Sequence, residues 1–399
     1  MGLTPTCDVF IIAGEPSGDA YGAAILEELR RRQPDTVCAA MGGPELAKAG
    51  AEVEQDIEGL AVMGLFPVLA RLPQFIRLGL RMAHLVRQRK PKVVLTIDYP
   101  GFNLRLARRL ADVRHAGTRF VHVVAPQVWA WKPRRAKSVA HSIDRLLCFF
   151  PFEPPLFSRF GCRADFIGHP LVDLVAKRFD TSGIDRALGI DASRPLLLLA
   201  PGSREREVST LLPIYHHAAE AAMRRTGQVA VAIAKVPDLP MDLYRRHSHF
   251  PLIEGHFREL CARAHLGLIA SGTATLEAGI IGLPHIIAYR MDRITAAIAR
   301  QVIRTEHVGL PNLVLERRAC PEVLQDQLTV PRLVAHIERL WAGPAREACR
   351  ADLVELRQRL GAGGAIATIA NILAEELEIG RRRETQVYPS GNRHLGTDG

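Results

Sequence analysis

The chain has 399 residues, 48% of them hydrophobic and 24% charged, so it can hold two domains and is typical of a soluble globular protein. Its seven cysteines are scattered without C-x-x-C spacing, which argues against a disulfide or zinc framework and for reduced thiols in the cytosol. The net charge of +10 suits phosphates, nucleic acid or an anionic membrane surface, and does not choose among them.

The chain opens with the pattern of a strand, a glycine-rich turn and a helix. Residues 9–13 are a short apolar run, residues 14–22 contain three glycines, and an amphipathic pattern follows. The turn matches neither G-x-G-x-x-G nor a Walker loop, so it is weak evidence for a ligand. A second apolar run, 93–97, ends in Asp98 before Tyr99 and Pro100. Ligands of open α/β sheets bind at the carboxyl ends of strands, which makes Asp98 a candidate.

The segment between these two strands is both apolar and basic. Residues 59–90 are rich in Leu, Val, Phe, Ile and Met, but arginines and two prolines interrupt them. This arginine density excludes a bilayer-spanning helix, whereas apolar stripes with basic flanks suit a membrane interface. We expect Leu60 to Arg89 to dock on anionic lipid. An amphipathic helix packed on its own domain fits the same pattern.

Strand and turn patterns continue to Pro170 and favour one doubly wound domain. Residues 121–125 read as a strand, and the loop after it carries Trp129 and Trp131. Tryptophans in a loop pack in cores more often than they stack on ligands. The polar, strandless stretch that follows, residues 173–193, is the predicted hinge.

A second α/β series begins at residues 195–200, an apolar strand that turns into a helix through residues 201–204. Ser203 and Arg204 place a hydroxyl and a guanidinium in this turn, which is a pattern that binds anions. We therefore expect a phosphate site in the second half of the chain.

The stretch 265–282 repeats this arrangement. An apolar run, 266–269, leads into a tight turn that opens a helix, with Ser271, Gly272 and Thr273 at its start. Free N–H groups and the helix dipole would favour an anion there, and Glu277 follows about one turn later, within reach of a ribose diol. An ordinary capped helix with a surface Glu is the alternative. Two such turns suggest a diphosphate between them.

No metal or cofactor is predicted. The histidines at 216, 217, 247, 249 and 256 lack the spacing of a zinc-binding helix, and no Asp-x-Asp pair occurs. A last helix is expected over residues 365–378, and the Arg-rich and Gly-rich tail after residue 380 is predicted to be disordered.

A set of short motifs, in order, closely resembles the bacterial lipid-A-disaccharide synthases. They extend over about residues 8–370, and each motif alone is only modest evidence for the family. They are Ala13-Gly14-Glu15 with Ser17-Gly18-Asp19, Leu60-Ala61-Val62-Met63-Gly64, Ile97-Asp98-Tyr99-Pro100, Val128-Trp129-Ala130-Trp131, Phe166-Ile167-Gly168-His169, Pro201-Gly202-Ser203-Arg204, Ser271-Gly272-Thr273-Ala274 with Leu276-Glu277, and Leu310-Pro311-Asn312-Leu313. The chain departs from the family pattern at Gln127, where Ser is common, and at Gly101, where a second Asp is frequent.

The resemblance implies an α/β fold of GT-B type, with two Rossmann-like doubly wound domains facing a cleft. Residues 1–172 would form the acceptor and membrane-facing domain, 194–379 the UDP-sugar domain with the terminal helix, and 380–399 the tail. The implied reaction joins UDP-2,3-diacylglucosamine to 2,3-diacylglucosamine 1-phosphate by inversion and releases UDP. It implies a peripheral protein on the cytoplasmic face of the inner membrane, with no nucleic-acid partner and with homo-oligomerisation left open.

The resemblance also assigns roles to residues. Ser203, Ser271, Gly272, Thr273, Glu277 and Asn312 would bind the donor, and Arg204 would offset the charge of its diphosphate. Inversion needs a base on the acceptor hydroxyl, and Asp98 matches the Asp of the family's Ile-Asp-x-Pro motif. Glu15, Asp19 and His122 are rival bases, and a helix cap is the structural alternative for Asp98.

Two other functions stay open at this stage. A nucleotide-sugar isomerase of the UDP-N-acetylglucosamine 2-epimerase type has the same architecture, but would not need an amphipathic membrane segment. A catalytically silent nucleotide-sugar or lipid-binding protein is disfavoured because Asp98, Arg204, Glu277 and Asn312 occur together.

Overall fold

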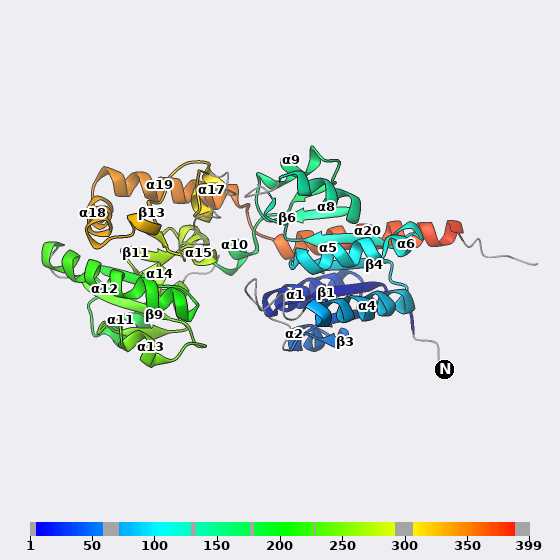
Figure 1. Ribbon diagram of the computed structural model, residues 1–399, viewed down its shortest axis with the longest axis horizontal. Coiled ribbons are helices and arrows are strands. Elements are labelled where there is room, and N and C mark those ends of the chain that lie inside the picture. The colour runs from blue at the N-terminus through cyan, green and yellow to red at the C-terminus, as the bar shows by residue number, and fades with distance from the viewer. Residues whose placement is uncertain are drawn as a thin grey trace, which may run out of the picture. The chain divides into compact units, whose positions relative to one another are not determined.

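The computed structural model describes residues 5–58, 72–128, 133–175, 179–226, 229–291 and 306–387. The chain forms two compact units, which are described separately. Unit 1 contains Met1–Gly168 and Gly364–Gly399, and unit 2 contains His169–Gly363. The predicted fold class is confirmed, since each unit is an α/β layer structure around a parallel sheet (Figure 1).

Unit 1 has a seven-stranded sheet in the order β3-β2-β1-β4-β5-β6-β7. Strands β1 and β4 are wholly buried and almost entirely apolar, as expected where helices cover both faces, whereas the edge strand β3 is polar and partly exposed. The strands are β1 Val9–Ala13, β2 Cys38–Gly42, β3 Glu52–Asp56, β4 Val93–Ile97, β5 Arg119–Val123, β6 Arg145–Cys148 and β7 Ala164–Phe166.

The helices of unit 1 connect parallel strands, and several begin with proline at the first turn, where its missing N–H costs nothing. They are α1 Pro16–Arg32, α2 Pro44–Lys48, α4 Leu72–Arg89, α5 Pro100–Arg109, α6 Ala111–His115, the 3₁₀ turn η1 Pro133–Arg135, α8 Ala136–Ser142, α9 Glu153–Ser158 and α20 Ala365–Val387.

Unit 2 has a six-stranded parallel sheet in the order β10-β9-β8-β11-β12-β13. The strands are β8 Leu196–Ala200, β9 Ala230–Lys235, β10 Leu252–Glu254, β11 Leu266–Ala270, β12 His285–Tyr289 and β13 Glu322–Leu324. The helices are α10 Pro170–Leu174, α11 Ser182–Leu188, α12 Glu205–Thr226, α13 Met241–Arg245, α14 Phe257–Arg263, α15 Thr273–Ile281, α17 Leu310–Leu315, α18 Val330–Trp341 and α19 Pro344–Arg359, with the 3₁₀ turn η2 Gln325–Gln327.

The terminal helix corrects one expected boundary. Helix α20 packs on unit 1, not on unit 2 as the predicted domain of residues 194–379 implied; it contacts α1, β4 and β5, and Figure 1 draws it in orange and red beside β4. Ile369 and Leu373 join the core cluster that contains Val9 and Val121. The fully buried Glu376 accepts hydrogen bonds from Arg119 at 2.7 Å and Arg145 at 3.4 Å.

Two further predictions concern connections. Helix α20 continues to Val387, so disorder from residue 380 is wrong for residues 380–387, and the rest of the tail lies outside the described residues. The expected hinge, 173–193, is strandless over its described part but contains α11, whose Ile184 is buried in a core cluster of unit 2. Within the described ranges, no helix is long and apolar enough to cross a bilayer.

Candidate active site

Asp98 lies at the carboxyl end of β4, in the middle of the unit 1 sheet. Its N–H continues the ladder to the Val123 carbonyl at 2.9 Å, and the buried Asn103 amide donates to its carbonyl at 2.7 Å. Asp98 and Tyr99 both have a φ of 48°, a left-handed conformation that costs energy in L residues. Two such residues in a row indicate a backbone held in place by its surroundings, as is frequent at functional sites.

Glu15 follows the adjacent strand β1 and precedes α1, so it lies at the same edge of the sheet. Burial raises the pKa of Asp98. Burial, and then the negative charge of Asp98, raises the pKa of Glu15. The two carboxyl groups therefore interact, and the ring of Tyr99 lies against Gly14, where an added Cβ would meet it at 2.9 Å. The structure brings two of the proposed bases together and leaves Asp98 partly exposed.

The other two rivals have structural roles. Asp19 is buried and accepts hydrogen bonds from three backbone N–H groups at the start of α2, those of Gly43 at 2.7 Å, Glu45 at 2.9 Å and Leu46 at 3.2 Å. His122 is fully buried with Nδ1 2.7 Å from the Thr96 hydroxyl, and burial lowers its pKa to about 4. Neither side chain is placed to contact a substrate.

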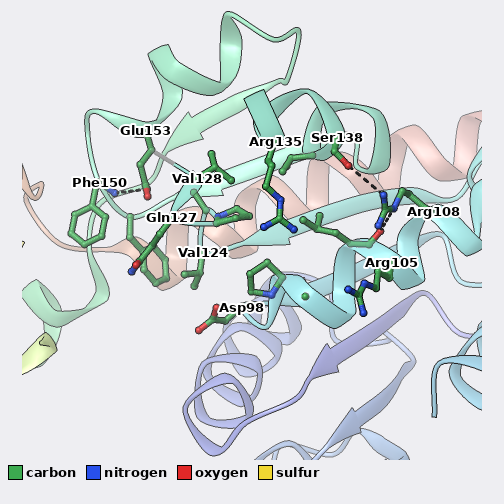
Figure 2. Close-up of a pocket in the computed structure, with 17 residues that line it drawn as sticks. Asp98, Arg105, Arg108, Val124, Gln127, Val128, Arg135, Ser138, Phe150 and Glu153 are labelled. Atoms are coloured by element: carbon green, nitrogen blue, oxygen red, sulfur yellow. Dashed lines mark hydrogen bonds between the residues drawn. The ribbon is translucent and has the colours of Figure 1, made fainter. Parts of the chain in front are cut away.

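A cavity of about 550 Å³ opens beside Asp98. Figure 2 shows it between the carboxyl ends of the strands and helices α5 and α8, with Asp98 on one side and three arginines along the rest. Gly101 and Gln127, the two departures from the family pattern, both line it. Its lining includes Arg105, Arg108, Val124, Val128, Arg135, Ser138, Phe150 and Glu153. Trp129 and Trp131 lie outside the described residues.

In unit 2, the loop after β8 binds a carboxylate of the chain itself. Glu207 accepts hydrogen bonds from the Ser203 N–H at 3.0 Å and from the Arg204 guanidinium at 3.2 Å. The Arg204 side chain is 58% exposed. A backbone N–H and a guanidinium thus converge on the chain's own Glu207, whereas the sequence predicted that the hydroxyl of Ser203 and the guanidinium of Arg204 bind a phosphate. Sequence reasoning missed this residue.

The turn after β11 is open to a ligand. Gly272 has a φ of 149° and no side chain caps α15, so the first N–H groups of this helix are free of side-chain partners among the described residues. Gly272 and Thr273 are exposed, whereas the Ser271 N–H belongs to the sheet, donating to Ala288 at 2.9 Å. These features suit an anion at the helix N-terminus.

Glu277 has a partner that the sequence did not indicate. Its carboxylate accepts a hydrogen bond from Arg258 of α14, and its side chain is 14% exposed. The contact with Arg258 restrains the direction of this carboxylate. The structure thus groups Ser271, Gly272, Thr273 and Glu277 on one turn and helix, and Arg204 follows the neighbouring strand.

Asn312 requires a correction. Its amide is fully buried, donating to the Cys320 carbonyl at 2.7 Å and to Glu322 at 2.8 Å, while its oxygen accepts from the Cys320 N–H at 2.9 Å. All of this bonding is internal, so Asn312 holds helix α17 in place instead of contacting a donor. The Leu-Pro-Asn-Leu pattern shows a residue type at a helix start, but not which way the amide points.

One side-chain group resembles a metal site. His216, His217 and Glu220 on α12 have ligand atoms within 4.8 Å of one another. However, the two imidazoles lie only 3.5 Å from the carboxylate oxygens, and His216 also contacts Ser248 at 3.0 Å. These side chains contact one another and Ser248, and none of the predicted site residues belongs to this cluster.

Comparisons with known proteins add the family. A family model described as lipid-A-disaccharide synthetase matches residues 9–359. A lipid-A-disaccharide synthase of Myxococcus xanthus is 35% identical over 379 residues, covering 94% of this chain and 98% of that protein. Its counterpart in Alcanivorax borkumensis is 36% identical, covering 92% and 97%.

Solved structures agree in fold at much lower identity. The UDP-GlcNAc 2-epimerase of Neisseria meningitidis, bound to UDP-GlcNAc, has a TM-score of 0.62 at 12% identity over 93% of this chain and 99% of that one. The calicheamicin glycosyltransferase CalG4 has a TM-score of 0.59 at 17% identity over 94% and 98%. An epimerase and a glycosyltransferase match about equally well, so these likenesses concern architecture alone.

Proposed function

The chain belongs to the family of lipid-A-disaccharide synthases, glycosyltransferases of lipid A biosynthesis, and from that premise we propose that it joins UDP-2,3-diacylglucosamine to 2,3-diacylglucosamine 1-phosphate. The products would be UDP and a β(1→6)-linked disaccharide 1-phosphate. The observation that carries this proposal is the partly exposed carboxylate of Asp98, held in a strained conformation beside a cavity of about 550 Å³.

In the proposed reaction Asp98 takes the proton of the acceptor's 6-hydroxyl while that oxygen attacks the anomeric carbon of the donor. The bond from this carbon to the diphosphate breaks on the opposite face, and its electron pair leaves on the UDP oxygen, so the configuration inverts. An alcohol is a poor nucleophile until its proton is being removed, and general base catalysis is typically worth about 10²–10⁴-fold.

The donor would bind to unit 2. The open N-terminus of α15 at Gly272 and Thr273 would receive the diphosphate, and Glu277 would accept hydrogen bonds from the ribose. Arg204 would exchange its contact with Glu207 for one with the departing diphosphate. In this proposal a guanidinium, and no metal ion, offsets the developing charge.

We further propose that the protein works as a peripheral protein on the cytoplasmic face of the inner membrane. Helix α4 supports this: it buries Leu78, Met82 and Val86 against unit 1, but Ile76 and Leu80 are 54% and 45% exposed, with the exposed Arg77 and Arg81 beside them. Apolar side chains flanked by arginines suit a membrane interface. The first part of the segment predicted to dock, residues 60–71, lies outside the described residues.

The reaction is tested by incubating the protein with UDP-2,3-diacylglucosamine, with and without the acceptor phosphate. We expect UDP release that depends on the acceptor, together with a β-linked disaccharide 1-phosphate in the product. A sugar changed in configuration without acceptor would instead identify an isomerase, and binding without turnover would identify a nucleotide-sugar carrier.

A further inference from the structure

Three arginines line the cavity beside Asp98. Arg105 and Arg108 come from α5 and Arg135 precedes α8, and in Figure 2 the Arg135 side chain extends toward the middle of the cavity. All three are exposed. Side chains of like charge that face one space repel each other, so such a cluster is most stable when an anion lies among them.

Among the described residues, no acidic partner is found for the two arginines of α5, Arg105 and Arg108. Arg108 bonds to the Leu104 carbonyl at 3.3 Å and the Ser138 hydroxyl at 3.5 Å, both neutral groups. Across the described part of the chain, no hydrogen bond or ion pair is found for Arg105. By contrast, Arg87 on the neighbouring helix α4 binds Asp112 through two bonds of 2.9 Å. Glu153, which also lines the cavity, is 2% exposed and accepts from the Phe150 N–H at 3.1 Å.

The arginines lie at a defined place relative to Asp98. Helix α5 begins two residues after Asp98, and Gly101, Arg105 and Arg108 recur at intervals that place them on one face of it. Pro100 begins α5, and with a rise of 1.5 Å per residue the five steps from Pro100 to Arg105 span roughly 7.5 Å. One end of the cavity therefore has a carboxylate and the other has guanidinium groups.

We propose that Arg105, Arg108 and Arg135 bind the phosphate group of the acceptor sugar. This inference rests on the proposed function and names the subsite within it that recognises the acceptor. A hexose 1-phosphate carries its phosphate on C1 and its 6-hydroxyl on the arm of C5, the two carbons that flank the ring oxygen, so the two groups can contact different parts of one cavity. Guanidinium groups form paired hydrogen bonds with phosphate oxygens, so anchoring the phosphate at the arginines directs the 6-hydroxyl to Asp98. The cluster would thereby select the linkage position.

The first test measures steady-state kinetics with each substrate varied in turn. Arg105→Gln and Arg135→Gln should each raise the KM for the acceptor phosphate about 10- to 100-fold, the loss of a hydrogen bond between charged groups. The KM for the UDP-sugar should stay at the parent value. Arg109→Gln and Arg134→Gln are matched controls, because these exposed neighbours carry the same charge but do not line the cavity. An unchanged acceptor KM in both cavity variants would overturn the inference.

A second test removes the phosphate instead of the arginine. With 2,3-diacylglucosamine as acceptor, kcat/KM of the parent should fall by about the same factor as an arginine substitution causes with the phosphorylated acceptor. The two cavity variants should fall little further with this acceptor, because removing the phosphate and removing the arginine eliminate the same contact. Losses that multiply would mean that the arginines act elsewhere. Absence of any disaccharide with the parent enzyme and the phosphorylated acceptor would refute the proposed function itself, which keeps the two failures apart.

A phospholipid headgroup is the alternative ligand that these arginines could bind. Sedimentation with phosphatidylglycerol vesicles distinguishes the two sources of phosphate. The cavity variants should bind these vesicles as tightly as the parent while their acceptor KM is raised. A fall in vesicle binding that accounts for the change in KM would assign the arginines to the lipid surface and overturn the inference.

Discussion

At the scale of single residues, the strained backbone at Asp98 and Tyr99 matters most. A left-handed conformation is least costly for Asn, Asp and Gly, so the position tolerates an acidic side chain but disfavours most others. The adjacent strand β5 is followed by Val124 with a φ of 74°, which is unusual for a β-branched residue. Strain at two neighbouring strand ends indicates that this edge of the sheet is shaped for a ligand.

The first prediction concerns Asp98. Asp98→Asn keeps the size and the tolerance for positive φ but removes the base, so kcat should fall about 10²–10⁴-fold while the Kd for UDP stays unchanged. Burial raises the pKa of Asp98, so the base becomes protonated at a higher pH than an ordinary carboxyl group. The parent's activity should therefore fall on the acidic side at a pH above the ordinary carboxyl range, and the pH profile of the variant should lack this fall. Steady-state pH profiles check both statements.

Stability provides the control for Asp98→Asn. A carboxyl group whose pKa is raised by folding disfavours the folded state above that pKa, and this cost disappears as the pH falls below it. Removing the charge should therefore leave the free energy of unfolding at neutral pH unchanged or slightly higher. A near-normal kcat would move the role to Glu15, and a large loss of stability would favour a structural role.

A second prediction at this scale concerns Glu277. Glu277→Ala should weaken UDP binding about tenfold or more, because each hydrogen bond from the ribose to its charged carboxylate contributes on the order of 1.5–3 kcal/mol. Glu259→Ala is the matched control, since Glu259 is an acidic residue next to Arg258 in the same helix. Titration calorimetry with UDP measures both. Equal affinity in Glu277→Ala and the parent would remove Glu277 from the donor site.

Sequence alone located some of these residues and not others. Asp98 could be predicted because a carboxylate that directly follows a buried strand of a parallel sheet lies at the ligand edge. The burial of Asp19 and Asn312 could not, because helix-start patterns do not specify side-chain direction. The partners Glu207 and Arg258 were also missed: Glu207 reads as an ordinary helix residue, and Arg258 meets Glu277 only through packing of α14 on α15.

At the scale of elements, one carboxylate of helix α20 pairs with arginines of two strands of unit 1 and of the residue before a third. Glu376 is fully buried beside Arg119 of β5, Arg145 of β6 and Arg163, which precedes β7. A buried charge that loses its partner destabilises a fold strongly, typically by about 3–5 kcal/mol. The helix is therefore part of the sheet's charge balance as well as of its core.

Glu376→Gln should accordingly lower the free energy of unfolding by about 1.5–3 kcal/mol, because Arg119 and Arg145 each lose a hydrogen bond to a buried charge while keeping Asp144 and Asp165 as partners. Glu375→Gln removes a neighbouring carboxylate that is 61% exposed, although it too contacts Arg145, and should cost less than about 1 kcal/mol. Urea denaturation compares the two variants. Similar losses of unfolding free energy in both variants would mean that the burial of Glu376 does not add to stability.

Helix α4 leads to the prediction about the membrane. Near an anionic surface each basic residue contributes about 1 kcal/mol, and salt screens this attraction. Arg77→Glu with Arg81→Glu should therefore release the protein from anionic vesicles, while Arg245→Glu with Arg246→Glu, the same change in charge on exposed residues of unit 2, should not. Vesicle sedimentation at low salt measures this. Retention of binding by the first pair would argue against docking through α4.

At the scale of the whole molecule, the chain completes unit 1 only after it has built unit 2. The order of strands and helices in each half could be predicted from short apolar runs that alternate with amphipathic segments. The return of the chain at Gly364 could not, because an apolar stripe such as that of α20 fits either unit. Its place follows from the ion pairs of Glu376 with Arg119 and Arg145 and from the packing of Ile369 and Leu373, which only the folded chain shows.

This connectivity makes the two units unequal as fragments, which yields the last prediction. Residues 169–363 form one uninterrupted stretch with its own six-stranded sheet and core, and they contain every residue proposed to bind the donor. The fragment should fold alone and bind UDP within a few-fold of the full-length Kd. Residues 1–168 lack α20 and leave the surface under Ile369 and Leu373 uncovered, so they should aggregate unless residues 364–387 are joined to them. Calorimetry and gel filtration check both fragments. A folded 169–363 fragment that fails to bind UDP would contradict the placement of the donor on unit 2.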